Sequence, residues 1–431
     1  MNGGSMTTLS RISMAAVAAL VVGVSSANAA DLGGNCCADL EERIAELEAT
    51  TARKGTRKVS LTISGQVSQE LLFWDDGLRS DVYVTGPNAS NSRWRFLGSA
   101  KISPDVTAGF LYELQTYVSA SSGVNQSNGG DDLGGAQSTL REAMVWIESA
   151  RLGRVSLGHG SNAANNSILV DLSGKGMAAS NGVFLHSNAF VLSNGLVYAA
   201  GGQNWGQFFQ GAAGEDWLNT RNEHIQYRTP TFAGFSLGAS VGEDNYWDVE
   251  GRYSGEFNGV RIAARLAYSV NSEFNAGGTP ATNFACTANC DKQIEQLAGS
   301  LSIRHMPTGL FFTGAAGWRD TSGADVTAGV GFDSNFYYLS SGVARNVTGL
   351  GDTVVYGEFS EWTGVSQSVF GLAAEDVALR HWGVGIVQHV DAAAMEFWLA
   401  YKNYSLVNGG DIGLAGAEDL HSITAGTRIR F

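Results

Sequence analysis

The sequence has 431 residues and a formal net charge of −14, and only 16% of its residues are charged, against roughly 25% in soluble domains. The acidic balance argues against nucleic acid as a partner, because the phosphate backbone binds basic surfaces. No apolar run of 18 residues follows residue 30, so a membrane-spanning helix is not expected there. Low charge, the absence of such a helix and many alternating segments are typical of a membrane β-barrel instead.

The N-terminus carries a predicted signal peptide over residues 1–29. Arg11 precedes an apolar run from Met14 to Val24, and Ala27-Asn28-Ala29 supplies an A-x-A cleavage site. The run is too short to act as an anchor helix across a bilayer. We therefore expect the chain to be exported.

Residues 30–57 are predicted to form a periplasmic helical segment. Leu40, Ile44, Leu47 and Thr51 follow a 4-3-4 spacing, which is the apolar stripe of about two heptads. Because so short a helix is unstable alone, it either pairs with copies of itself in an oligomer, plugs the barrel or acts as a spacer.

Four cysteines are present in this exported chain, where disulfides can persist. For Cys286 and Cys290 we prefer a small loop disulfide to a metal pair, because no nearby His or Cys completes four ligands. Cys36 and Cys37 follow the signal without a lipobox-like Leu-Ala-Gly, so lipidation is not expected.

From residue 58 onward, apolar and polar residues alternate with period two, which gives each strand one apolar and one polar face. The predicted strands are 58–74, 91–102, 106–118, 138–149, 154–160, 222–230, 235–242, 246–257, 260–270, 294–305, 310–318, 334–344, 353–362, 379–389, 394–405 and 420–431. Short connections alternate with long ones rich in Gly, Ser, Asn and Asp. This pattern predicts that residues 58–431 form a 16-stranded antiparallel transmembrane β-barrel with short periplasmic turns.

The aromatic residues and the C-terminus agree with this fold. Many aromatic residues fall on the apolar register, several near strand ends where interfacial girdles lie, and some are expected to face a neighbouring subunit. The last strand alternates regularly and ends at Phe431. This ending resembles the C-terminal signal that outer-membrane barrels present to the barrel assembly machinery.

About sixty residues, 161–221, interrupt the pattern between the fifth and sixth strands. A structureless segment of this length in a compact domain is usually functional or disordered. We interpret it as a third long loop that folds into the barrel, with the part from Ile168 to Gly176 as the candidate constriction. The later part is interpreted as a surface lid or a contact between subunits.

Motifs for catalysis and metal binding are weak. Gly234-Phe235-Ser236-Leu237-Gly238 matches G-x-S-x-G, but a turn precedes it and a strand follows, whereas a nucleophile elbow needs a strand and then a helix. His381 and His389 are too far apart on one strand face to share a metal. We therefore predict no catalytic residues, no metal site and no cofactor.

Arginines on the inward register form two predicted groups. Arg93, Arg95 and Lys101 share one strand face, and Arg428 and Arg430 share a face of the last strand, which closure brings beside the first. The second group lies on adjacent strands: Arg252, Arg261 and Arg265. These arginines either brace the wall by pairing with Glu70, Glu113 or Glu358, or produce a transverse field that orients polar solutes.

Two stretches resemble a known family. The mature N-terminus of alphaproteobacterial, rhizobial-type outer-membrane porins resembles the stretch GNCCADLEERIAELEATTARKGTRKVSLTISGQVSQELLFWDDG. The fifth strand and inward-folded third loop of the same family resemble LGRVSLGHG followed by ILVDLSGKG. The resemblance implies a homotrimeric general porin, in an outer membrane of lipid and lipopolysaccharide, with Asp171 at the acidic position of the constriction. The stretch 177–221 is longer and more aromatic than this family leads us to expect.

We therefore expect a passive channel for small hydrophilic solutes and ions. Its predicted constriction residues are Asp171, Arg93, Arg95, Arg261, Arg265 and Arg428. The alternative is a channel selective for sugar or phosphate that uses the aromatic residues of 184–217 as a stacking surface. A barrel enzyme such as a lipase and a purely structural barrel are further alternatives, and the sequence alone does not predict ion selectivity.

Overall fold

The computed structural model describes residues 58–116, 119–130, 138–179, 189–199, 204–206, 218, 221–243, 245–272, 293–322, 332–363, 377–409 and 416–431. All of them belong to one compact unit, Ala52–Phe431. The predicted signal peptide, the N-terminal helical segment and all four cysteines lie outside these residues. Among the described residues, no helix has both the length and the apolar character needed to cross a membrane.

The described elements are seventeen strand segments and one 3-10 turn. They are β1 (Ser60–Asp75), β2 (Ser80–Thr85), β3 (Ser92–Ser103), β4 (Val106–Thr116), β5 (Ser138–Ser149), β6 (Gly153–Ser161), β7 (Arg221–Arg228), β8 (Phe235–Gly242), β9 (Trp247–Phe257), β10 (Val260–Asn271), β11 (Gln293–His305), β12 (Leu310–Ser322), β13 (Phe332–Arg345), β14 (Thr353–Thr363), β15 (Ala378–Val390), η3 (Asp391–Ala393), β16 (Met395–Val407) and β17 (Leu420–Arg430).

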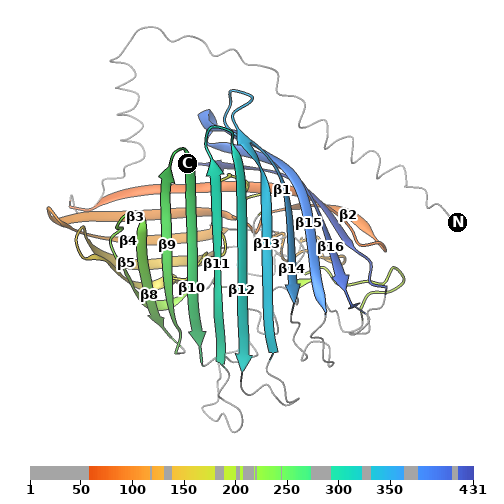
Figure 1. Cartoon of the computed structure of the whole chain (residues 1–431), viewed down its shortest axis with the longest axis horizontal. Helices are drawn as coiled ribbons and strands as arrows, with labels where there is room; N and C mark the ends of the chain where they lie inside the picture. The colour runs from red at the N-terminus through yellow and green to blue at the C-terminus, as the bar shows by residue number, and fades with distance from the viewer. Residues whose placement is uncertain are drawn as a thin grey trace. The chain divides into compact units, whose positions relative to one another are not determined.

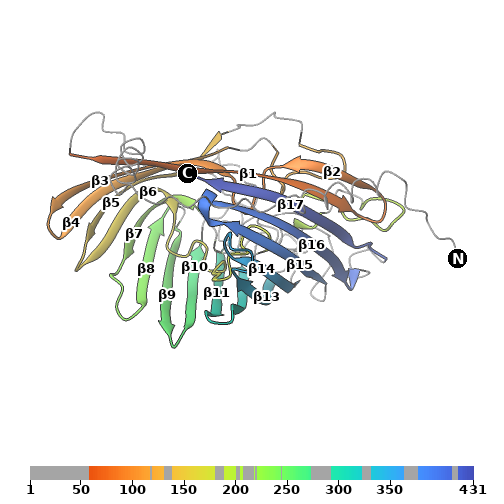
Figure 2. The same ribbon diagram turned by 90° about the horizontal axis from the view of Figure 1, so that it is seen from above.

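Strands that follow one another pair antiparallel, except that β2 and β3 both pair with β1, and the sheet closes on itself (Figures 1 and 2). The last strand, β17, pairs with β1 from Gln66 opposite Arg430 to Asp75 opposite His421. Strands β2 and β3 both pair with β1, β3 along its first part and β2 along its last part, so they are two halves of one wall strand. The wall is therefore a closed barrel of sixteen antiparallel strands, as the sequence predicted.

The interruption between β2 and β3 was not predicted, because β2 was assigned to a loop. Pro87 lies in this interruption and cannot donate a ladder hydrogen bond. Ser90 and Asn91 instead turn toward β1, where the side-chain amide of Gln66 donates to both of their carbonyl oxygens at 3.0 and 2.7 Å. This turn places Ser90 and Asn91 against the inner wall.

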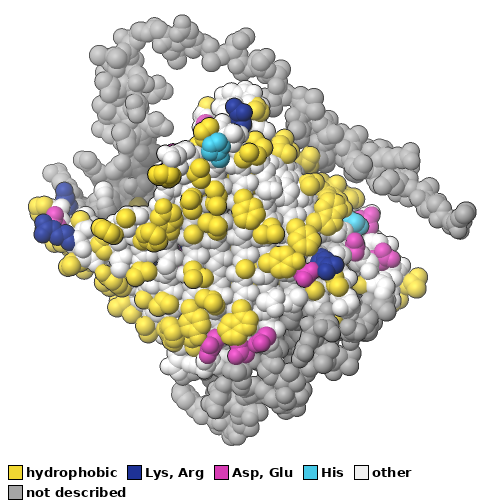
Figure 3. Space-filling model, in the orientation of Figure 1, with side chains coloured by type: hydrophobic (Ala, Val, Ile, Leu, Met, Phe, Trp, Pro, Cys, Tyr) yellow, Lys and Arg dark blue, Asp and Glu magenta, His cyan; other side chains and the backbone are white. Residues whose placement is uncertain are grey.

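Alternation gives the wall two faces of different character. On β10, Leu266 is 59% exposed on the outward face, whereas its neighbour Ala267 is 2% exposed on the inward face. Figure 3 shows that hydrophobic side chains cover the outward face over β9 to β13, with most of the visible charged side chains near its ends. An apolar band between polar ends is what a hydrocarbon layer requires of a barrel wall.

The short turns follow ordinary hairpin chemistry. Asn258 and Gly259 join β9 to β10, and both have positive φ, 49° and 75°. An Asn-Gly pair in this conformation matches the right-handed twist of the strands it connects. The sequence thus specifies the register of this hairpin locally.

The hydrophobic core of the protein lies inside the barrel and includes the insert. Ile168, Phe190, Leu192, Trp205 and Leu218 of the insert are all buried and pack in one cluster with inward-facing wall residues. The wall residues of this cluster come from β1 and from β10 to β17: Leu72, Trp74, Ala267, Ala298, Ala315, Phe336, Tyr338, Trp362, Leu379, Tyr404 and Leu420. The insert therefore fills one side of the barrel and leaves the wall from β3 to β9 outside this cluster.

Candidate functional site

The insert is fixed at its start by hydrogen bonds to β8 and β9. The backbone N–H of Ala163 donates to the hydroxyl of Ser240 at 2.6 Å, and that of Ala164 donates to Asp248 at 2.9 Å. These partners point inward because they lie on the polar register of their strands. They turn the chain into the barrel as soon as β6 ends.

Strand β11 then holds the insert by two serines on the same face. The backbone N–H of Val170 donates to Ser300 Oγ and that of Leu172 donates to Ser302 Oγ, both at 3.0 Å. Arg304 Nη1 donates to the carbonyl of Leu172 at 3.3 Å. Because residues two apart on a strand share a face, Ser300, Ser302 and Arg304 form a row of polar side chains that bond to the backbone of the insert.

Asp171 is bonded mainly within the insert itself. Its carboxylate pairs with Lys175 Nζ at 3.2 Å and accepts hydrogen bonds from the Ser173 hydroxyl at 2.7 Å and the Gly174 N–H at 3.0 Å. Burial alone would raise the pKa of Asp171, but the Lys175 ammonium and the Ser173 hydrogen bonds outweigh it and lower that pKa. In the described structure, Asp171 closes a tight turn.

The insert then continues along the wall to β15 and β16. His389 on β15 lies 3.0 Å from the carbonyl of Gly174 through its Nε2 atom. Met177, Ala178 and Ala179 pack in a second buried cluster with wall residues that include Val387 and Trp398. Residues 163–179 thus run along the inner wall from β8 to β16.

The later part of the insert lies inside the barrel where it is described, rather than over its surface or against another subunit. Val191 and Gln126 exchange two hydrogen bonds, of 2.9 and 2.7 Å, between the backbone of Val191 and the side-chain amide of Gln126. Phe190 packs on Trp74 with ring centroids 5.1 Å apart, and Trp205 packs on Tyr404 at 6.3 Å. These two aromatic residues are buried in the core, whereas Phe184, Phe208, Phe209 and Trp217 lie outside the described residues.

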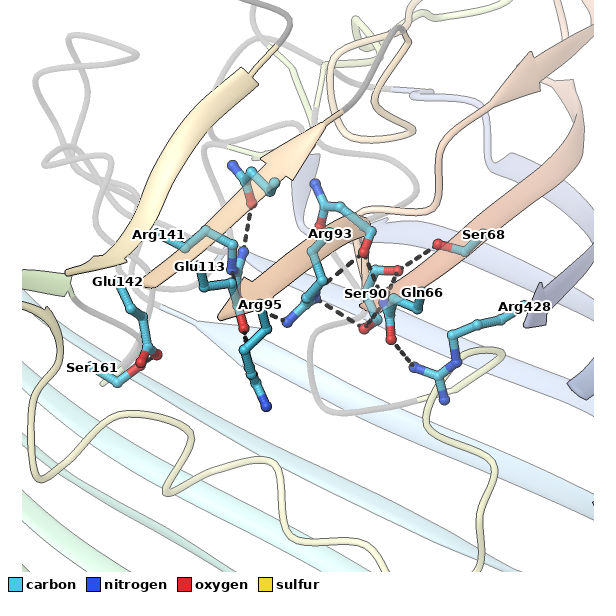
Figure 4. A network of polar contacts seen from close by, with 12 residues as sticks. Gln66, Ser68, Ser90, Arg93, Arg95, Glu113, Arg141, Glu142, Ser161 and Arg428 are labelled. Atoms are coloured by element: carbon cyan, nitrogen blue, oxygen red, sulfur yellow. Dashed lines mark hydrogen bonds and ion pairs between the residues drawn. The ribbon is translucent and has the colours of Figure 1, made fainter. Parts of the chain in front are cut away.

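Arginines gather on the inner wall in three groups, each around a single carboxylate. Glu113 on β4, only 1% exposed, pairs with Arg93 at 3.3 Å, with Arg141 at 2.8 Å and with Arg95. Figure 4 shows these three guanidinium groups converging on the one carboxylate from β3 and β5. These four side chains carry three positive charges and one negative charge, and Glu142, the register partner of Glu113, adds a carboxylate beside them that bonds to Ser161.

A second group has the same composition. Glu250 on β9 is fully buried and pairs with Arg228 at 3.5 Å, with Arg265 at 3.8 Å and with Arg252. Arg252 and Arg265 are direct partners in the register of β9 and β10, where two like charges repel each other. The shared carboxylate offsets only part of this repulsion.

A third group lies near the C-terminus. Glu396 on β16 pairs with Arg428 at 2.5 Å and with Arg430 at 3.6 Å. Arg428 also donates to Gln66 at 3.5 Å, and Gln66 is the register partner of both Arg93 and Arg430. The first and third groups are therefore neighbours on the wall, as closure of the barrel predicted.

The remaining predicted site residues lie apart from these groups or outside the described region. Arg261 pairs with Glu256 at 2.7 Å, and both side chains are about half exposed. It is four residues from Arg265, or roughly 13 Å along the strand, next to the Asn258-Gly259 turn. The C-terminal Phe431 pairs through its backbone with Gly65, and Ser236 lies in β8 rather than before a helix.

Sequence reasoning missed Arg141 for a definable reason. A register shift between Glu113 and Leu114 leaves Arg141 as an extra residue on β5, and a bulge of this kind changes the face on which a side chain lies. By simple alternation Arg141 would face outward with Ala143 and Val145. Glu250 and Arg228 were also missed, although Glu250 shares the inward register of Arg252.

Comparisons with known proteins agree with the barrel. Residues 15–428 match the family model described as Gram-negative porin, and no curated protein matches the sequence. Similar solved structures include the anion-selective porin from Comamonas acidovorans, with 17% identity, a TM-score of 0.53 and coverage of 86% of this chain and 100% of that one. OmpT of Vibrio cholerae has 11% identity, a TM-score of 0.52 and coverage of 88% and 99%.

A third similar structure is OmpF of Salmonella typhi in complex with daunomycin, with 14% identity, a TM-score of 0.51 and coverage of 87% and 98%. At these identities the structural likeness concerns the fold. The family match, by contrast, covers nearly the whole sequence. The chain therefore belongs to the Gram-negative porin family, whose members form water-filled β-barrel channels across the bacterial outer membrane.

Proposed function

We propose that this porin is a homotrimeric diffusion channel that favours small anions over cations. The observation that carries the proposal is the surplus of arginine on the lumenal wall. Eight arginines surround three carboxylates in the described structure: Arg93, Arg95 and Arg141 at Glu113, Arg228, Arg252 and Arg265 at Glu250, and Arg428 and Arg430 at Glu396. Five positive charges in these groups are therefore not offset within them.

The insert does not supply the opposing acidic face in its described part. Before β7 begins at Arg221, its two charged side chains there, Asp171 and Lys175, pair with each other. The field in the lumen is then set by the arginine wall, and positive charge on the walls of a narrow passage raises the local concentration of anions. Asp171 contributes to the constriction by holding the shape of the insert.

The net charge of −14 does not oppose an anion preference, because many carboxylates lie away from the lumen. Glu361, for example, pairs with Arg380 at 2.6 Å on the outward register of β14 and β15. The likeness to a porin described as anion-selective supports the same proposal. Only charges beside the ion path bias the ions that pass.

Several finer features complete the proposal. The resemblance at the N-terminus and at residues 152–176 favours the alphaproteobacterial branch of the family, and the trimer form recorded for the similar Vibrio OmpT supports a homotrimer. We assign residues 1–29 to a cleaved signal, residues 30–57 to a periplasmic segment and Cys286–Cys290 to a loop disulfide. Phe431 is assigned to recognition by the assembly machinery.

The test is a reversal-potential measurement on single channels in a planar bilayer across a KCl gradient. The wild-type channel should show a chloride preference. The double variant Arg93→Gln/Arg95→Gln should lose part of this preference. The control Arg380→Gln, on the outward face, should keep the wild-type value. A potassium preference in the wild type would overturn the proposal.

A further inference from the structure

A cavity of about 440 Å³ lies between the insert and the inner wall formed by β8, β9 and β10. The insert contributes the apolar side chains of Leu169 and Val170 on one side. The wall contributes two arginines, two serine hydroxyls and a methyl group: Arg252, Arg265, Ser236, Ser254 and Ala263. This size falls within the range of ordinary small-molecule sites, well above what an inorganic ion requires.

The two guanidinium groups keep unused donors beside the cavity. Arg252 bonds through Nε to Glu250 and through Nη2 to the carbonyl of Ala163, and Arg265 bonds through Nη1 to the carbonyl of Asn165. Within the part of the chain that the structure describes, Arg252 Nη1 and the Nε and Nη2 of Arg265 have no hydrogen-bond partner. Arginine N–H groups of this kind bind carboxylate oxygens in pairs.

Charge favours an anion in the same place. Glu250 is shared by Arg252, Arg265 and Arg228, and Asp171, which also lines the cavity, is already paired with Lys175. A second carboxylate between Arg252 and Arg265 would relieve the repulsion between two like charges in direct register.

We infer that this cavity is a binding site for a small organic anion that joins a carboxylate to a compact apolar body. The carboxylate binds between Arg252 and Arg265, with the hydroxyls of Ser236 and Ser254 close by. The apolar body packs against Leu169 and Val170. The site makes the porin a weak, saturable binder of such anions as well as a passage for them.

The inference rests on the proposed anion preference of the lumen and specifies one anion class within it. Saturation-transfer NMR on the detergent-solubilised full chain tests it directly, with benzoate as the probe. Benzamide is the neutral isostere and acetate is the anion without an apolar body. Benzoate should bind saturably, and benzamide and acetate each about tenfold more weakly, since each lacks one half of the recognition.

Two variants locate the site. Arg265→Gln should weaken benzoate binding about tenfold, the effect of losing a charge-assisted hydrogen bond. Arg261→Gln is the matched control, because Arg261 is on the same strand and register but does not line the cavity, and it should bind as the wild type does. If Arg265→Gln fails to fold, as judged by heat-modifiable migration on a gel, Ser254→Ala replaces it with a smaller expected loss.

The outcomes separate the site from the channel function. Benzoate binding that does not saturate, that benzamide or acetate matches, or that Arg261→Gln weakens as much as Arg265→Gln overturns the site. The reversal potential in KCl without benzoate reports the anion preference independently. A chloride-preferring channel without saturable benzoate binding would leave the proposed function standing and remove only this inference.

Discussion

Replacing Glu113 by Gln tests the arginine wall most severely, because one carboxylate is shared there by three guanidinium groups. The Glu113 side chain is 1% exposed, while those of Arg93, Arg141 and Arg95 are 17%, 15% and 44% exposed. Breaking a buried ion pair costs about 3–5 kcal/mol. Water screens Arg95, so we expect a loss near the lower end, about 3 kcal/mol of unfolding free energy.

The assay is urea unfolding of the purified porin in lipid vesicles, with Glu148→Gln as the matched control. Glu148 pairs with one arginine, Arg154, and both side chains are about two-fifths exposed, so its loss should cost less than about 1 kcal/mol. The double variant Glu113→Gln/Arg141→Gln should recover part of the loss, since one unpaired charge is removed. Equal, small losses in Glu113→Gln and Glu148→Gln would refute the assignment of Glu113 as the carboxylate that holds the group together.

Three further predictions concern the insert and the turns. The lowered pKa of Asp171 means that its stabilisation of the insert is complete at neutral pH and is lost as pH falls through a value below the ordinary 3.8. Open-channel current noise should therefore rise in strong acid, and Asp171→Asn should show the raised noise already at pH 7. A noise level that neither acid nor the substitution changes would contradict this role of Asp171. Gln126→Ala removes both hydrogen bonds to Val191 and should speed amide exchange in 189–199 by about tenfold or more. Unchanged exchange would show that these two hydrogen bonds do not hold this part of the insert. Gly259→Val, at φ 75°, should cost about 1–2 kcal/mol in urea unfolding, and a neutral effect would contradict the left-handed turn.

The strands could be predicted because a wall between hydrocarbon and water imposes period two on nearly every segment. Only local departures from this alternation were not predicted. Pro87 splits one wall strand into β2 and β3, and the bulge at Glu113 turns Arg141 inward against its apparent register. Neither can be read from alternation, because each depends on how a neighbouring strand continues its ladder.

The site was predicted less well because its chemistry depends on pairing between strands. That Arg93 and Arg95 face inward follows from their register, and Glu113 was already one of three candidate partners. That Glu250 serves three arginines requires the inward directions of β7, β9 and β10 together. Asp171 and Lys175 are four residues apart in sequence, but whether they face each other or the lumen is decided by the turn that Ser173 and Gly174 make.

The central claim is that solutes pass along the wall of β3 to β7, while the insert and its core occupy the other side. Thiol accessibility tests it in a background with all four native cysteines changed to serine. Leu97 on β3 is 40% exposed on the lumenal register, and Ala315 on β12 is 7% exposed beneath the insert. A charged methanethiosulfonate reagent should reduce the single-channel conductance of Leu97→Cys in steps and leave Ala315→Cys unchanged. Modification of Ala315→Cys with no effect at Leu97→Cys would contradict the account.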